Sequence, residues 1–495
     1  MMNPALKARR VYSRELGMRG VWGAPFRAME CPVPGENLDG TTMGVQKSLL
    51  DGLHFTQQGL AELFIRLHGE VTRYCHDSRT WRIWDGTRWK RDETEEIFRL
   101  ILGTVRTIHH IADTWEIEND NDRIQQEQIK RWAIRSETRR TMEEALKLVR
   151  VNESIAVTEN LFDADPYLLN IQNGTLDLRS GELQDHRQGD YISMLAPVVY
   201  DRDAKCPNWE SFIRAVAGED GDLIRYLQQV TGYALTEDAR EEVFYLLYGP
   251  PQSGKTTFLE VIRALLGDYA RQADFSTFVA SRFISPNSPR SDLVRLSRAR
   301  LVTASEAESG QRWAEGLIKR LTGGDTVTAR ALYRESHEYR PGFKLCFALN
   351  DLPDVRPEEE AFWRRTIVIP FNHKVSEEKV DKSLREKLKS ELPGILAWAV
   401  RGCLDWQRHG FTVPSVIREA TNKYREETDT IRQFLDECCT VEARARVLSG
   451  DIYSRYVAWS KTFNLEPVSH KAFIQYLVRK LACAKKRGER QIAHT

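Results

Sequence analysis

The sequence has no long apolar run, no cysteine motif and almost no net charge. No apolar stretch approaches the roughly 20 residues that span a bilayer, so no membrane partner is expected. The eight cysteines form no Cys-x-x-Cys pair, and no histidine stands at ligand spacing from them. This pattern disfavours a zinc site and is typical of reduced thiols in a cytosolic protein. A formal charge of +1 gives no global attraction to nucleic acid, so a DNA site must be a local cluster of basic side chains.

The sequence also lacks an internal repeat, and 495 residues are too many for one hydrophobic core. We expect three folded regions: an α+β region over 51–207, an α/β core over 208–390, and a helical region over 391–495. Residues 1–50 hold several arginines and few acids. This composition predicts a solvated basic tail, with a transit peptide as the alternative.

The first region mixes a hairpin with long helices. Asp85 followed by glycine, between two tryptophan-containing runs, predicts a hairpin turn. Amphipathic helices are expected over 97–115 and 125–151. Asp163 and Asp165 resemble the Asp-x-Asp pair of a polymerising metal site. No convincing acidic or histidine partner stands near them, so a turn between elements is the favoured interpretation.

A phosphate-binding loop is predicted at residues 249–257. An apolar run ends at Tyr248, the pattern Gly-x4-Gly-Lys-Thr follows, and a helical pattern begins at once. Glycines let backbone N–H groups close around a phosphate, Lys255 supplies a cation, and Thr256 offers a hydroxyl to Mg²⁺. This order predicts ATP binding with Mg²⁺ at a helix N-terminus, and we expect Lys255 to be partly exposed. The loop comprises Gly249, Pro250, Pro251, Gln252, Ser253, Gly254, Lys255, Thr256 and Thr257.

An ATPase also needs an acid near the phosphates. The apolar run 300–304 is consistent with a buried parallel strand, and it ends at Ser305 and Glu306. Ligands bind at the carboxyl edge of open α/β sheets, so a carboxylate there lies beside the phosphate loop. Glu306 is the candidate that orients water, with Glu308 in reserve. A solvated glutamate at a helix start is the alternative.

A γ-phosphate sensor and a cation for the transition state are predicted on the next two apolar runs. Asn350 follows the run 343–349, where an amide can bind both phosphate and water; simple turn chemistry is the alternative. Arg364 and Arg365 precede the run 366–371. A guanidinium suits the transition state because it stays charged and engages two oxygens.

The order of these motifs resembles that of the superfamily 3 helicases, in the helicase half of satellite-phage and plasmid primase-helicases and their poxvirus relatives. The likeness covers residues 50–480 and implies an AAA+-type P-loop ATPase core with a parallel central sheet. It also implies an α+β collar before the core and a helical, winged-helix domain after it. The segments that carry the likeness are 81–89, 168–181, the phosphate loop, Ser305-Glu306, 317–330 with its Thr322-Gly-Gly-Asp string, 343–350 and 363–365.

The resemblance implies a homohexameric ring that hydrolyses ATP between subunits and moves on single-stranded and forked DNA in the cytoplasm of a bacterial host. Glu306 would be the acid of the second motif and would help to hold Mg²⁺. Asn350 would be the sensor. Arg365, with Arg364 as the alternative, would reach the nucleotide of the neighbouring subunit.

The same resemblance implies a DNA-gripping hairpin between residues 325 and 343. Its tip would lie near Tyr333 and Arg334, with Arg330 and Lys344 as further DNA contacts. Two features depart from the family pattern. Serine replaces the first of two adjacent acids before Glu306, and no primase domain fits before residue 50, so a separate primase or initiator is expected.

The last region predicts a winged helix. The helical pattern 470–481 is followed by the basic run 485–488, which suits a helix in a DNA groove and a strand on phosphates. A helical lid with a solvated tail is the alternative. Two rival functions remain for the whole chain: an ATP-switched origin binder that does not unwind DNA, and a small-molecule kinase that uses the same loop.

Overall fold

The computed structural model divides the chain into two compact units. One comprises Met1–Trp81 and Asp92–Val157, and the other comprises Arg82–Arg91 and Thr158–Thr495. The residues that the structure describes are 48–280, 289–305, 311–330, 336–355, 360–373, 381, 383–440, 446–463, 465, 467–480, 483–485 and 491–494.

The first unit is mainly helical. Its elements are α3 (Gln57–His68), β1 (Thr72–Cys75), α4 (Glu96–Asp113), α5 (Asp120–Ser136), α6 (Arg139–Val149) and β4 (Ala156–Val157), with β1 parallel to β4. Helix α4 packs through Ile97, Ile101 and Val105, which recur at helical spacing. The single helix expected over 125–151 is wrong, because Thr138 accepts a hydrogen bond from Thr141 N and starts a new helix there.

Short antiparallel strands open the second unit. Strand β3 (Trp89–Arg91) pairs with the end of β2 (Thr80–Trp84) across the predicted turn, where Gly86 has φ +96°. A three-stranded sheet follows, in the order β5 (Leu168–Ile171), β6 (Gly174–Asp177) and β7 (Glu182–Gln184). The 3₁₀ turns of this unit are η1 (Glu159–Leu161), η2 (Gln188–Asp190), η3 (Gly267–Tyr269) and η4 (Phe275–Phe278).

The second unit begins before the boundary expected at residue 207. Leu169 and Val198 share one hydrophobic cluster with Leu227 and Ile262. This common core ties the short strands to the helices that precede and follow the phosphate loop. The chain therefore divides near residue 157 and not at the composition change near 207.

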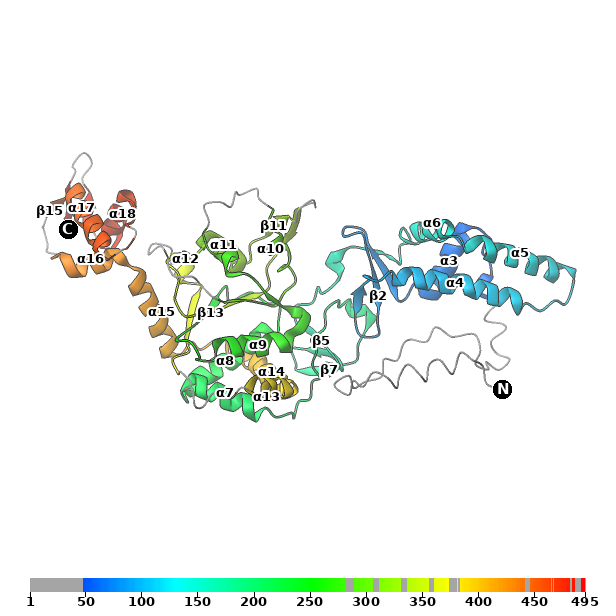
Figure 1. The fold of residues 1–495 in the computed structure, drawn as a ribbon, viewed down its shortest axis with the longest axis horizontal. Helices are drawn as coiled ribbons and strands as arrows, with labels where there is room; N and C mark the ends of the chain where they lie inside the picture. The colour runs from blue at the N-terminus through cyan, green and yellow to red at the C-terminus, as the bar shows by residue number, and fades with distance from the viewer. Residues whose placement is uncertain are drawn as a thin grey trace. The chain divides into compact units, whose positions relative to one another are not determined.

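A five-stranded sheet lies at the centre of the second unit (Figure 1). Its order is β14-β8-β13-β10-β9, and all neighbouring strands run parallel. The strands are β8 (Phe244–Tyr248), β9 (Ala270–Gln272), β10 (Leu301–Ser305), β13 (Lys344–Leu349) and β14 (Thr366–Pro370). The predicted α/β class with a parallel sheet is confirmed.

Alternate residues of each strand point to opposite faces of this sheet, and helices cover both faces. The helices are α7 (Pro207–Ala217), α8 (Gly221–Ala234), α9 (Lys255–Leu266), α10 (Ser291–Val294), α11 (Glu315–Thr322), α12 (Glu360–Trp363), α13 (Leu384–Ser390), α14 (Leu392–His409) and α15 (Ser415–Thr428). Tyr245 and Leu247 pack with residues of α7, α8, α9 and α14, whereas Phe244 and Leu246 pack with residues of α11 and α12. Two buried faces are typical of a parallel sheet.

A hairpin of β11 (Val327–Arg330) and β12 (Ser336–Tyr339) stands beside the sheet, and a small α+β group ends the chain. The group contains α16 (Thr430–Cys438), β15 (Arg446–Leu448), α17 (Ser449–Thr462), α18 (His470–Lys480), β16 (Cys483–Lys485) and β17 (Gln491–His494). Its strands form an antiparallel sheet in the order β15-β17-β16. Phe434, Tyr456 and Phe473 centre its own hydrophobic cluster.

Candidate functional site

The phosphate loop joins the end of β8 to the start of α9. Gly254 has φ +91° and stands at the N-cap of α9, and Gln252 has φ +64°, a left-handed conformation that few side chains adopt. A Cβ atom at Gly249 would lie 2.1 Å from the carbonyl oxygen of Phe371, so only glycine fits there. The loop thus presents backbone N–H groups at a helix N-terminus, which favours an anion.

Lys255 is buried within this loop and not partly exposed as expected. The residue is 6% exposed, and its Nζ donates to the carbonyl oxygens of Gly249 and Pro250, both at 2.8 Å. It also donates to the Ser253 hydroxyl at 3.1 Å. Burial lowers the pKa of the ammonium. Charged phosphate oxygens accept hydrogen bonds more strongly than carbonyl oxygens do. The carbonyl oxygens of the loop therefore hold the Lys255 ammonium beside the place where the motif puts a phosphate.

Asn350 stands at the same edge of the sheet as the loop. Leu349 pairs with Tyr248 in the parallel register, so Asn350 and Gly249 follow paired residues. Gly249 N also donates to the carbonyl oxygen of Leu349 at 3.4 Å. Asn350 is exposed and therefore accessible from this edge.

The next strand of this edge, β10, ends at Ser305, which pairs with Ala348. Glu306 and Glu308 lie outside the described residues. Thr256 is exposed in the first turn of α9. Among the described residues, no group of three or more His, Cys, Asp and Glu side chains could hold a metal. The loop at this edge suits a nucleotide phosphate, and the Thr256 hydroxyl would be a described side-chain ligand if Mg²⁺ were bound there.

Lys344 does not contact DNA, and that prediction is wrong. The residue is 2% exposed, and its Nζ donates to the Thr236 carbonyl at 2.6 Å and to the Gly342 carbonyl at 3.2 Å. The Nζ lies 4.3 Å from the centroid of the Tyr233 ring. Burial, together with the charge of Arg300, lowers its pKa to about 7. The enclosed ammonium fixes the end of α8 to the sheet and cannot reach a DNA phosphate.

Arg364 and Arg365 lie at the opposite edge of the sheet from the phosphate loop. Both precede the first residue of β14, whereas the loop follows the last residue of the neighbouring β8. Five residues of strand, at about 3.3 Å each, separate these edges by roughly 15 Å. An arginine side chain is too short to bridge that distance. Neither arginine can therefore serve the phosphate loop of its own subunit.

The two arginines differ in exposure. The Arg365 side chain is 10% exposed, and its Nη2 donates to Oε2 of Glu242 at 2.8 Å. Its Nη1 donates to the Ala361 carbonyl at 2.9 Å. The Arg364 side chain is 69% exposed, with Nη2 3.6 Å from the same Glu242 oxygen. Arg364 is therefore the more accessible of the two, whereas the expected order placed Arg365 first.

The hairpin predicted between residues 325 and 343 is present. Val327 and Ala329 are buried against the sheet side, while Arg330 is exposed at the end of β11. Tyr333 and Arg334 lie outside the described residues. Among the predicted DNA-contact residues that the structure describes, Arg330 is thus the one with an exposed positive charge.

Asp163 and Asp165 belong to a turn, as favoured. Both oxygens of Asp163 accept hydrogen bonds from Ser193, and one also pairs with Arg298 at 3.3 Å. Asp165 pairs with Arg179 at 2.8 Å. These partners leave no acidic pair for a metal.

The last group of elements has the order expected of a winged helix. Helix α16, strand β15, helices α17 and α18 and then strands β16 and β17 follow one another, with an antiparallel sheet. Of the basic run predicted for the wing, 485–488, Lys485 is the last residue of β16, and residues 486–488 lie outside the described residues. Among the described helices of the chain, none is long and apolar enough to cross a membrane.

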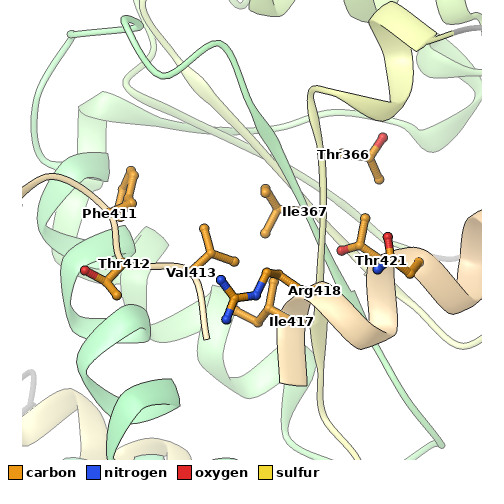
Figure 2. Close-up of a pocket in the computed structure, with 9 residues that line it drawn as sticks. Thr366, Ile367, Phe411, Thr412, Val413, Ile417, Arg418 and Thr421 are labelled. Atoms are coloured by element: carbon orange, nitrogen blue, oxygen red, sulfur yellow. The ribbon is translucent and has the colours of Figure 1, made fainter. Parts of the chain in front are cut away.

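A groove of about 620 Å³ lies beside β14 (Figure 2). It is lined by Ile367 of the strand, by Phe411 and Val413 of a loop, and by Ile417 and Arg418 of α15. This lining is mostly apolar and belongs to the outer side of the sheet. The groove lacks the N–H donors of the phosphate loop and is not the nucleotide site.

Sequence reasoning missed Glu242, which binds both candidate arginines. It stands two residues before β8, in a charged run that ends the α8–β8 connection. An acid just before a phosphate-loop strand was the available signal. The arginines that contact Glu242 are distant from it in sequence, so neighbouring residues could not indicate its role.

Comparisons with known proteins agree with the motifs. Residues 61–218 match the family described as D5 N terminal like, and residues 247–365 match a family of unknown function, DUF5906. The chain is 28% identical over 323 residues to "Putative helicase L207/L206" of Acanthamoeba polyphaga mimivirus, covering 61% of this chain and 33% of the relative. It is 27% identical over 384 residues to "Putative helicase 022R" of Frog virus 3, covering 61% and 39%. The chain thus spans about a third of the length of these curated relatives.

Among solved structures, the apo NrS-1 C terminal region (305-718) is similar with a TM-score of 0.49 and 11% identity, covering 88% of this chain and 98% of that chain. The sequence comparisons define the class: a chain similar to viral helicase-type proteins. They confirm the predicted resemblance to the superfamily 3 primase-helicases of phages and viruses.

Proposed function

We propose that this chain is the motor of a hexameric, ATP-dependent replicative DNA helicase of a mobile genetic element, active in the cytoplasm of a bacterial host. The observation that carries the proposal is the division of labour between the two edges of one sheet. The phosphate loop and Asn350 share the carboxyl edge, and Arg364 stands at the other. A subunit built in this way needs a neighbour to complete its site.

Each residue of the carboxyl edge has a defined task in this proposal. Lys255 leaves its loop carbonyls for phosphate oxygens, and Thr256 with Glu306 holds Mg²⁺. When bound, Mg²⁺ neutralises charge on the phosphates. Glu306 orients the attacking water, and Asn350 holds the γ-phosphate without adding charge. Arg364 of the neighbouring subunit stabilises the charge that develops during transfer to water.

The hairpin is proposed to grip single-stranded DNA. The exposed Arg330 supports this role, and we assign the tip residues Tyr333 and Arg334 to the same contact. Stacking of a base on an aromatic ring contributes roughly 1–3 kcal/mol.

A second candidate function is an ATP-switched origin binder that assembles on duplex DNA without unwinding it. The winged-helix order of α16 to β17 favours it, since such a group places one helix in a DNA groove. The two functions differ in whether ATP hydrolysis separates strands.

The test combines an ATPase assay with unwinding of a forked duplex. Lys255→Ala should lower the ATPase rate to less than about a tenth, because the charge neutralisation that lysine supplies is central to phosphoryl transfer. Lys423→Ala is the control, since Lys423 is 77% exposed on α15 and far from the loop in sequence. Unwinding with ATP but not with a non-hydrolysable analogue identifies a helicase. ATPase activity without unwinding identifies the origin binder, and activity retained by Lys255→Ala contradicts both.

A further inference from the structure

Glu242 connects the two arginines at the amino edge of the sheet. One oxygen, Oε2, accepts a hydrogen bond from Arg365 at 2.8 Å and lies 3.6 Å from Nη2 of Arg364. Arg365 is enclosed, whereas Arg364 is largely exposed. A single carboxylate therefore ties an exposed guanidinium to a buried one.

The backbone sets the direction of this carboxylate. Glu242 has φ +52°, in the left-handed region that a non-glycine residue seldom occupies. Its N–H donates to the Ala239 carbonyl at 3.1 Å, and Phe244 N donates to the Arg365 carbonyl at 2.9 Å. Strain of this kind persists where surrounding contacts determine the conformation, and it is common at functional positions.

We propose that Glu242 is a positioning residue for the arginine that acts in the neighbouring subunit. Arg365 anchors Glu242, and Glu242 restricts the rotamers of Arg364 before a neighbour arrives. This inference rests on the proposed ATPase function.

The strengths of the two contacts suit that role. The Arg365 contact is short and enclosed, so it is the firm one. The Arg364 contact is longer and exposed, and exposed ion pairs are weak and screened by salt. Arg364 can therefore exchange Glu242 for phosphate oxygens, which bind a guanidinium through two parallel hydrogen bonds. Preorganisation of the charged group, and not binding of ATP, is what Glu242 provides.

The test is the split between kcat and KM in the steady-state ATPase. Glu242→Gly removes the carboxylate, and glycine accepts φ +52° without strain; thermal unfolding of this variant checks that the fold tolerates the loss of the enclosed Arg365 contact. We expect kcat to fall about 10²-fold, the effect of a catalytic group misplaced by roughly 1 Å. The KM for ATP should stay constant, because ATP binds at the opposite edge of the sheet. Glu242→Gln keeps an acceptor oxygen and should lie between the wild type and Glu242→Gly.

Glu241→Gln is the matched control in the same loop. Glu241 accepts a hydrogen bond from Trp406 Nε1 at 2.8 Å, and glutamine can accept it equally, so kcat should not change. The double variant Glu242→Gly with Arg364→Ala should be no slower than Arg364→Ala alone, because the two residues act as one unit.

Three outcomes would overturn the inference: an unchanged kcat in Glu242→Gly, a loss confined to KM, or effects that multiply in the double variant. The proposed function fails separately, through Lys255→Ala. If Lys255→Ala is inactive while Glu242→Gly keeps its kcat, the ATPase stands and the role of Glu242 does not.

Discussion

Lys344 links the stability of the fold to pH at the scale of one residue. Its ammonium is enclosed beside the Tyr233 ring and bound by the carbonyls of Thr236 and Gly342. Burial lowers its pKa to about 7 from an ordinary value of 10.5. Between these values the unfolded chain keeps the proton and the folded chain releases it. The contribution of Lys344 to the free energy of unfolding therefore rises with pH from about 7 to about 10.5.

Lys344→Met is predicted to flatten this dependence. The wild type should gain about 1 kcal/mol of unfolding free energy per pH unit, relative to the variant, from about pH 7 to about pH 8.5. Urea unfolding across that range measures the difference, and staying below about 8.5 limits ionisation of thiols in the unfolded chain. Lys423→Met is the control. Because Lys423 is exposed, the unfolding free energy of this variant should change with pH in parallel with that of the wild type. If the unfolding free energy of Lys344→Met changed with pH as that of the wild type does, the Lys344 ammonium would not be buried in the folded chain.

Burial differs among three basic side chains that have similar positions in the sequence pattern. Lys344, Arg364 and Arg365 all stand at the start of an apolar strand, and each was a candidate for an exposed role. Their partners decide the outcome, since Thr236 and Glu242 come from the distant α8–β8 connection. No local pattern reveals such partners. The order of the motif residues along the chain suggests their chemistry, but their burial could not be predicted from it.

At the scale of the element, the turn from β8 to α9 depends on a backbone contact with the end of β14. Gly249→Ala is predicted to lower the free energy of unfolding by roughly 1–3 kcal/mol, the usual range for overpacking. The added Cβ would meet the Phe371 carbonyl at 2.1 Å, and backbone cannot give way easily. Binding of a fluorescent ATP analogue should also be lost, and thermal unfolding reports the stability.

Gly103→Ala is the matched control for Gly249→Ala. Gly103 lies within α4, and nothing stands within 4 Å of an added Cβ. Alanine there should raise stability by about 0.5–1 kcal/mol through helix propensity. Wild-type stability and nucleotide binding in Gly249→Ala would mean that the loop can adopt another backbone path.

The hairpin gives a second element-scale prediction. Arg330→Ala should weaken binding of single-stranded DNA and lower the salt dependence of that binding by about one unit of slope, because one phosphate contact is lost. DNA-independent ATPase activity should stay near normal, since Arg330 is exposed on β11 and not at the phosphate loop. Fluorescence anisotropy over a salt series measures both quantities. Arg139→Ala, which removes an arginine 83% exposed in the first unit, should change neither. An unchanged slope in Arg330→Ala would place the DNA grip elsewhere.

Helices and strands could be predicted where a strong hydrophobic periodicity coincided with turn-forming residues. The strands β8, β10, β13 and β14 lie where apolar runs placed them, whereas the hairpin β11-β12 was expected from the family resemblance alone. Helix ends were harder, because a polar residue inside a helical pattern can either continue a helix or cap a new one. Thr138 shows this, since it caps α6 and breaks the single helix expected over 125–151. Capping competes with propagation, and only packing decides between them.

At the scale of the whole molecule, the proposed function divides one active site between the two edges of the central sheet. The phosphate loop lies at the carboxyl edge and Arg364 at the amino edge, so under this proposal a subunit alone would lack its transition-state cation. Head-to-tail contact between subunits would bring unlike edges together, and such heterologous contacts form a ring where the rotation between subunits closes. Boundaries between units were the least predictable feature. The strands β5 to β7 belong to the sheet unit through packing that composition does not report.

Mixed assemblies test this division directly. Lys255→Ala and Arg364→Ala should each be inactive alone, because every interface lacks either a working loop or a working arginine. In an equal mixture, about a quarter of the interfaces pair an intact loop with an intact arginine, so ATPase activity should partly return. The control replaces Arg364→Ala by the double variant Lys255→Ala with Arg364→Ala. That mixture contains no intact loop and should stay inactive. Native mass spectrometry establishes that the subunits have mixed; if mixed assemblies remain inactive, Arg364 does not complete the site of a neighbouring subunit.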